Sequence, residues 1–189
     1  MSTYCALHIQ TADRQSLLSE LERFLASRRG SRVVVAPDPD APESIYGDVF
    51  ICSEDQPTRF AVDSGRAGWF VAHYNSFNTL SKLAADISRA LQSLVVVVMA
   101  QSVSDAYHLE LWRAGKHLRT LYFGDGDWIR NEGAPLPFES SPLGTNLADE
   151  GEEPYFNFGR SDMIEYCGNL GLPLWQESSG EPPWTVVRA

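Results

Sequence analysis

Three histidines and one glutamate are the residues whose chemistry stands out in this chain of 189 residues. His8 and His73 occupy matching positions in two strand-like segments, and His108 alternates with Glu110 along a third. If a sheet brought all four to one face, three imidazoles and a carboxylate could hold a metal ion. However, no spacing typical of a metal site accompanies them. We therefore predict ordinary structural histidines, with no metal and no other cofactor.

Two short motifs could suggest other chemistry. The run from Gly124 to Trp128 (Gly-Asp-Gly-Asp-Trp) resembles the start of a calcium loop, but Ile129 and Leu136 stand where such a loop needs oxygen ligands. Asp63-Ser-Gly65 lacks the second glycine of a nucleophile elbow. Glycine-rich phosphate-binding motifs do not occur in the sequence. We therefore expect a turn after Gly124 and no catalytic residue, which favours a protein that is not an enzyme.

The charge of the chain is acidic and unevenly distributed. The formal net charge is −10, with 9 Lys/Arg against 11 Asp/Glu in residues 1–100 and 6 against 14 in residues 101–189. A surface of this sign repels phosphate backbones, so we expect no nucleic-acid partner and regard a basic protein as the natural partner. The alternative is that the acidity only keeps the protein soluble.

Acidic and aromatic residues come together in the Pro- and Gly-rich stretch 133–160. Carboxylates can steer a basic partner towards the surface, while aromatic side chains can anchor it. The alternative is that the aromatic residues belong to the core and the acids only to the surface. The residues predicted to contact a partner are Glu150, Glu152, Glu153, Tyr155 and Phe156.

The cysteines and the apolar runs indicate where the protein works. Cys5, Cys52 and Cys167 are an odd number, are far apart and form no Cys-x-x-Cys pair, which favours reduced thiols. The longest apolar run, Leu94 to Ala100, is too short to cross a membrane, and no signal-like segment begins the sequence. We therefore expect a cytoplasmic protein without a membrane contact, and the sequence leaves its oligomeric state open.

Apolar spacing that switches between period 2 and period 3.6 predicts two strand-helix-strand units in the first hundred residues. The units match in order and length, which fits either an internal duplication or chance. The predicted elements are a strand over Tyr4–Gln10, a helix ending at Gly30, a buried strand over Arg32–Ala36, short strands over Asp48–Cys52 and Phe60–Val62, a strand over Gly68–Tyr74, a helix between Leu80 and Leu91, and a strand over Leu94–Ala100.

The remaining residues predict a hairpin over Ala106–Phe123 and then an irregular cover. One helix from Ser161 to about Asn169 and a final strand over Trp184–Val187 belong to this cover. We therefore predict one α+β domain over residues 1–189, with a sheet core in 1–126 and a C-terminal cover in 127–189. Its sheet is mixed and mostly antiparallel, with two helices on one face and the C-terminal segment closing part of the other.

The hairpin region also carries a resemblance to other proteins. Ser104–Phe123, followed by Trp128 and Pro135–Glu139, resembles a pattern of small bacterial α+β proteins of unassigned function. Some of those proteins resemble immunity proteins of toxin systems. The resemblance covers about a third of the chain, is structural rather than catalytic, and therefore implies no active-site residue.

These observations lead to two hypotheses of function. The favoured one is a non-enzymatic protein-binding module, most concretely an immunity-type inhibitor whose acidic C-terminal half masks a basic toxin or effector. The alternative is a small enzyme or ligand-binding domain with a pocket between the sheet and the C-terminal segment. A convex acidic patch would favour the first, and a concave site with converging polar groups would favour the second.

Overall fold

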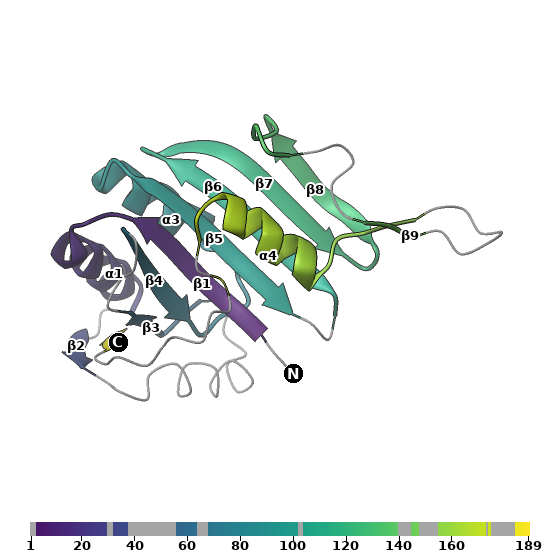
Figure 1. Cartoon of the computed structure of the whole chain (residues 1–189). Helices are drawn as coiled ribbons and strands as arrows, with labels where there is room; N and C mark the ends of the chain where they lie inside the picture. The colour runs from purple at the N-terminus through teal and green to yellow at the C-terminus, as the bar shows by residue number, and fades with distance from the viewer. Residues whose placement is uncertain are drawn as a thin grey trace.

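An antiparallel sheet of nine strands forms the centre of the protein (Figure 1). The computed structural model describes residues 3–29, 32–37, 56–63, 68–101, 104–139, 145–147, 155–172, 174 and 184–189. The strand order is β2-β11-β3-β4-β1-β5-β6-β7-β8. The strands are β1 Thr3–Gln10, β2 Val34–Pro37, β3 Arg59–Val62, β4 Trp69–Tyr74, β5 Leu94–Gln101, β6 Ala106–Arg113, β7 Lys116–Gly124, β8 Asp127–Gly133 and β11 Thr185–Arg188.

Two helices cover one face of this sheet. They are α1 (Arg14–Arg29) and α3 (Ser81–Ala90), and they bury leucines such as Leu17 and Leu83 against apolar side chains of the central strands. Each helix begins where the spacing of apolar residues in the sequence changes from period 2 to period 3.6. At the start of α1, the Asp13 carboxylate accepts a hydrogen bond of 3.0 Å from the backbone N–H of Ser16, as a helix N-cap does.

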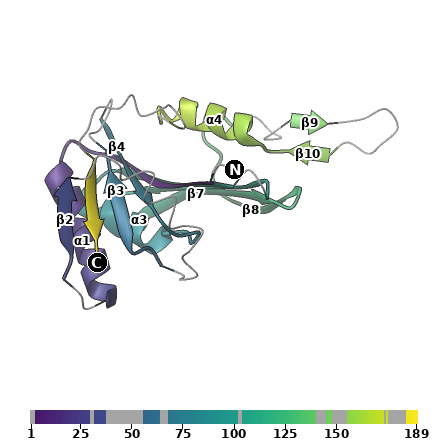
Figure 2. The same cartoon turned by 90° about the horizontal axis from the view of Figure 1, so that it is seen from below.

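The region around α4 covers the opposite face, but the final strand that the sequence analysis assigned to this cover was placed wrongly, because β11 lies within the main sheet between β2 and β3. Helix α4 (Arg160–Asn169) packs Met163, Tyr166 and Cys167 against β-strand side chains in a second core. A small two-stranded sheet, β9 (Thr145–Leu147) and β10 (Tyr155–Asn157), extends beyond the N-terminal end of α4, away from α1 (Figure 2). The predicted α+β fold is therefore confirmed, with two helices on one face and the C-terminal segment on the other.

The topology differs from the predicted order of neighbours. The two strand-helix-strand units interleave, because β1 lies between β4 and β5 and pairs antiparallel with both. All strand pairs in the described part of the chain are antiparallel. The strand predicted to be buried, β2, is instead the edge of the sheet, and Val34 and Val35 are 39% and 42% exposed.

Two tight turns join β6 to β7 and β7 to β8. In the first, Ala114 and Gly115 have φ of 49° and 78°, and in the second, Asp125 and Gly126 have φ of 54° and 79°. Both central residues of a two-residue hairpin turn adopt positive φ when the turn matches the twist of the strands. The expected turn after Gly124 is therefore confirmed, and it leads into β8, a strand that the sequence pattern did not predict.

Parts of the predicted pattern lie outside the described residues. These are Cys52 and the short strand expected over Asp48–Cys52. Cys5 and Cys167 are buried free thiols, and burial raises the pKa of Cys5 to about 12. Across the described ranges, none of the helices combines the length and the apolar character needed to pass through a lipid bilayer.

Candidate functional site

The predicted partner-binding segment is attached to the sheet by a buried ion pair. On β7, Arg119 donates hydrogen bonds from Nε and Nη2 to the carboxylate of Glu139, at 2.9 Å to Oε1 and 2.7 Å to Oε2. Tyr166 of α4 donates its hydroxyl to the same Oε1 at 2.6 Å. The side chains of the ion pair are 3% and 2% exposed. A bidentate pair of this kind is strong and directional, so it fixes the chain at residue 139.

The electrostatics of this network keep both partners charged. Burial alone would raise the pKa of Glu139, but hydrogen bonds from Arg119 and Tyr166 outweigh it and hold the pKa of this carboxyl below its usual value. Burial and the adjacent Glu139 carboxylate raise the pKa of Tyr166, so its hydroxyl remains a donor. Arg119 also donates from Nη1 to the backbone carbonyl of Glu132 at 2.9 Å, which ties β7 to β8.

A second anchor follows the hairpin β9–β10. Phe158 is 2% exposed and packs in the α4-side core, with its ring centroid 5.1 Å from that of Trp128 and 6.3 Å from that of Tyr107. Two residues later α4 begins, and the Asp162 carboxylate accepts a hydrogen bond of 2.7 Å from the backbone N–H of Gly159. The chain is therefore held on both sides of residues 140–157.

We call residues 140–157 the arm. It contains four acidic residues and no Lys or Arg. Of the residues predicted to contact a partner, Tyr155 and Phe156 lie on β10, and Glu150, Glu152 and Glu153 lie outside the described residues. Strand β10 pairs with β9, with Tyr155 opposite Leu147 and Phe156 opposite Asn146.

The structure separates the histidines that the sequence grouped together. Side chains alternate between the two faces along each strand. His8 on β1 and His73 on β4 point to the α4 face, whereas His108 and Glu110 on β6 point to the α1/α3 face. The expectation that all four could share one face was therefore wrong. No group of three or more metal-binding side chains comes together within the described ranges.

His8 is an uncharged part of the core. Its Nε2 is 2.9 Å from the Tyr4 hydroxyl, and no part of the residue is exposed. Burial, followed by the positive charge that His73 can carry, lowers the pKa of His8 to about 3. A histidine in this state packs as a neutral ring.

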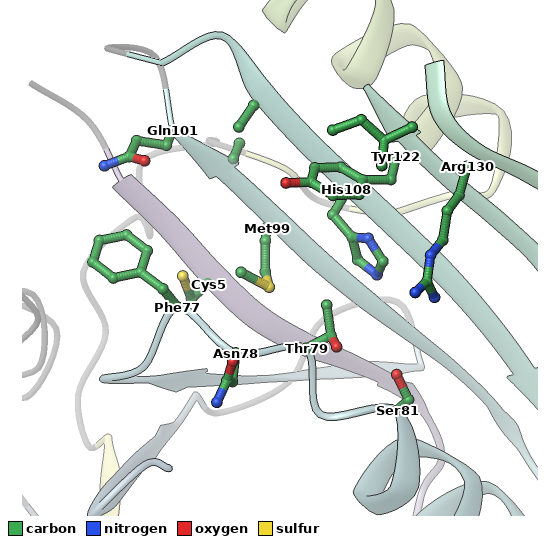
Figure 3. A pocket seen from close by; sticks show the side chains of 13 residues that line it. Cys5, Phe77, Asn78, Thr79, Ser81, Met99, Gln101, His108, Tyr122 and Arg130 are labelled. Atoms are coloured by element: carbon green, nitrogen blue, oxygen red, sulfur yellow. The ribbon is translucent and has the colours of Figure 1, made fainter. Parts of the chain in front are cut away.

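A cavity of about 410 Å³ lies on the α1/α3 face (Figure 3). One row of side chains from neighbouring strands forms its floor, since the strand registers place each residue opposite the next. The loop before α3, with Phe77, forms one wall. The row contains Cys5 of β1, Met99 of β5, His108 of β6, Tyr122 of β7 and Arg130 of β8.

A β-bulge in β8 shapes the other wall of the cavity. Tyr122 pairs with Arg130 but Phe123 pairs with Trp128, so Ile129 is an extra residue in β8. A bulge lets two consecutive side chains point to one face. Ile129 and Arg130 accordingly both line the cavity, while Trp128 packs in the core under α4.

Beside the cavity, on the same face of the sheet, Glu110 connects β6 to α3. Its Oε2 accepts a hydrogen bond of 2.6 Å from Ser81, the first residue of α3, and lies 3.7 Å from Nε2 of His108. Burial would raise the pKa of Glu110, but the neighbouring His108 and the Ser81 hydroxyl lower it below its usual value. A carboxylate at a helix N-terminus is also favoured by the helix dipole.

This cavity is not the pocket that the alternative hypothesis placed between the sheet and the C-terminal segment. It lies on the opposite face, and under α4 the strand side chains and the cover form a packed core. The sequence analysis assigned no role to Arg130 or Tyr122. No alternation in β8 marks Arg130, and the pattern of β7 does not reveal which strands lie beside it.

No protein-family model, no curated protein and no solved structure matches this chain.

Proposed function

We propose that this chain is a non-enzymatic protein-binding module, an immunity-type inhibitor that uses its arm to bind a basic toxin or effector. The observation that carries the proposal is the pair of anchors around the arm, the Arg119–Glu139–Tyr166 network before it and Phe158 after it. Between these anchors the sequence holds four acids and no base.

Fixing the ends of a segment matters because binding must offset the entropy of ordering it. A hairpin held at its base loses less conformational freedom when it docks than a free tail does. Acidic residues on such a segment raise the rate at which a basic partner arrives. Tyrosine, as at Tyr155, is among the residue types that contribute most at interface centres, and phenylalanine, as at Phe156, is enriched in interface cores.

One further feature supports this function. Ser104–Phe123, with Trp128 and Pro135–Glu139, resembles small bacterial proteins of unassigned function, some of which resemble immunity proteins of toxin systems.

The test is direct binding to the proteins encoded by the neighbouring reading frames in the genome. Each is purified and titrated against the chain, and lysozyme, an unrelated basic protein, serves as the negative control. We expect one neighbour to bind at least about a hundredfold more tightly than lysozyme, a difference of about 2.7 kcal/mol. Failure of every neighbouring product to exceed lysozyme would contradict the proposal.

A further inference from the structure

We propose that the cavity on the α1/α3 face binds a small organic carboxylate with a flat apolar body, whose carboxylate is held by Arg130. This inference is independent of the arm and of protein binding. The cavity lies on the face of the sheet opposite α4, and its lining comes from five neighbouring strands and the loop before α3 (Figure 3).

The charge of the lining favours an anion. The whole chain has 25 acidic and 15 basic residues, yet the cavity is lined by one arginine, one histidine and no Asp or Glu. The buried carboxylate of Glu110 is not part of the lining, because it is bonded to Ser81 and lies 3.7 Å from His108. In a protein of this composition, a concave site without acidic groups selects for negative ligands.

Arg130 is placed to receive that charge. The bulge at Ile129 turns its guanidinium towards the cavity, and no carboxylate in the described ranges lies within ion-pair distance of it. The guanidinium fork matches a carboxylate with two parallel hydrogen bonds. A ligand carboxylate can therefore pair with the Arg130 guanidinium without displacing a carboxylate of the protein.

The floor fits a flat apolar body. Met99 and Cys5 place sulfur-bearing side chains on the cavity face, beside the small side chain of Ala106. A methionine sulfur makes favourable contacts with aromatic rings and adapts to their shape. At the cavity wall Phe77 is 43% exposed, so an apolar surface is available to cover a bound ring.

His108 is a fixed part of the cavity floor rather than a ligand contact. Both of its ring nitrogens are buried, and Nε2 lies 3.7 Å from Oε2 of Glu110. Tyr122 packs edge-on against this ring, with centroids 5.5 Å apart, and holds it in place.

The test uses the methyl signals of the three methionines, observed by NMR in the full-length chain. Met99 lies in the cavity, whereas Met163 is buried on the opposite face and reports on the rest of the protein. The probe is 2-naphthoate, and its neutral counterpart 2-naphthamide has the same ring without the charge. We expect 2-naphthoate to shift the Met99 signal in a saturable manner and to leave Met163 unchanged.

Two arginine variants make the assignment specific. Arg130→Gln should weaken 2-naphthoate binding about tenfold, to the level of 2-naphthamide, since it removes the charge-assisted pair. Arg113→Gln, another exposed arginine at the far end of β6, should leave it unchanged. The proposal is overturned if 2-naphthoate does not shift Met99, or if the amide or the Arg130→Gln variant binds equally well.

Discussion

Arg119 and Glu139 form a bidentate ion pair whose two side chains are 3% and 2% exposed, and this pair joins β7, next to the edge strand β8, to the start of the arm. Its position matters more than its strength. It fixes the arm at one end, while Phe158 fixes the other. The arm therefore has both of its ends fixed on the protein, which is the basis of the proposed binding mode.

Breaking this pair should destabilise the fold. Glu139→Gln leaves the buried Arg119 guanidinium without a counter-charge, and we expect the free energy of unfolding to fall by about 3 kcal/mol. Urea denaturation at neutral pH measures it. Glu132→Gln is the matched control, because the Glu132 side chain is exposed and only its backbone carbonyl bonds to Arg119. Equal stability of the two variants would show that the pair is not needed.

Replacing both partners separates charge burial from packing. In Arg119→Met/Glu139→Met no buried charge is left unpaired, so we expect the double variant to recover at least about half of the loss seen in Glu139→Gln. The same urea titration gives the comparison. A double variant that is less stable than Glu139→Gln would mean that the hydrogen bonds, including the one from Tyr166, contribute more than the charge balance does.

Acid should destabilise the protein through His8. Its pKa is about 3 in the folded chain because of burial, against about 6.5 when unfolded, so the unfolded state binds the proton first as the pH falls. The stability that the neutral His8 ring contributes is complete above about pH 6.5 and is lost progressively as the pH falls towards about 3. By about pH 5 the loss from His8 should be about 2 kcal/mol, and His73, whose pKa burial lowers to about 4, adds to the loss of the whole protein.

Variants at His8 test the assignment of this pH dependence. His8→Gln removes the titrating ring and should make the unfolding free energy about 2 kcal/mol less sensitive to a change from about pH 7 to about pH 5. His117→Gln, a change on β7 at an exposed residue, is the control and should retain the dependence of the unaltered chain. If His8→Gln kept the full dependence, the titrating group would lie elsewhere.

Glycine is required at the end of β8. Gly133 has φ of 90°, and a Cβ there would lie 2.2 Å from the backbone carbonyl oxygen of Leu118. Gly126 has a similar φ of 79° but nothing within 4 Å of such an atom. We expect Gly126→Ala to cost about 1 kcal/mol from backbone strain alone and Gly133→Ala at least about twice as much. Thermal unfolding of both variants checks the difference, and equal melting temperatures would contradict it.

Most of the fold follows from local sequence pattern. The helices over Arg14–Arg29 and Ser81–Ala90 and the β6–β7 hairpin combine clear periodicity with turn residues, so their existence could be predicted. Strand β8 was not predicted, because it is an edge strand whose side chains are mostly exposed and therefore show no alternation of apolar and polar residues. The apolar run in β2 suggested burial, but its neighbours on the sheet leave it at an edge.

The candidate sites depend on register, which no local pattern contains. Glu139 meets Arg119 and Tyr166 across 20 and 27 positions of sequence, and no spacing rule links such residues. The error with His108 has the same origin. Alternation shows which residues of one strand share a face, but it does not relate that face to the face of another strand.

The central claim is that the acidic arm binds a basic partner. The most direct test compares two variants of equal net charge, Glu150→Lys/Glu152→Lys/Glu153→Lys in the arm and Glu22→Lys/Glu132→Lys/Glu165→Lys on exposed positions elsewhere. The measurement is the dissociation constant for the partner identified among the neighbouring gene products, at about 50 mM salt. We predict that the arm variant binds at least about tenfold more weakly than the control variant. Equal affinities for the two variants would contradict the account.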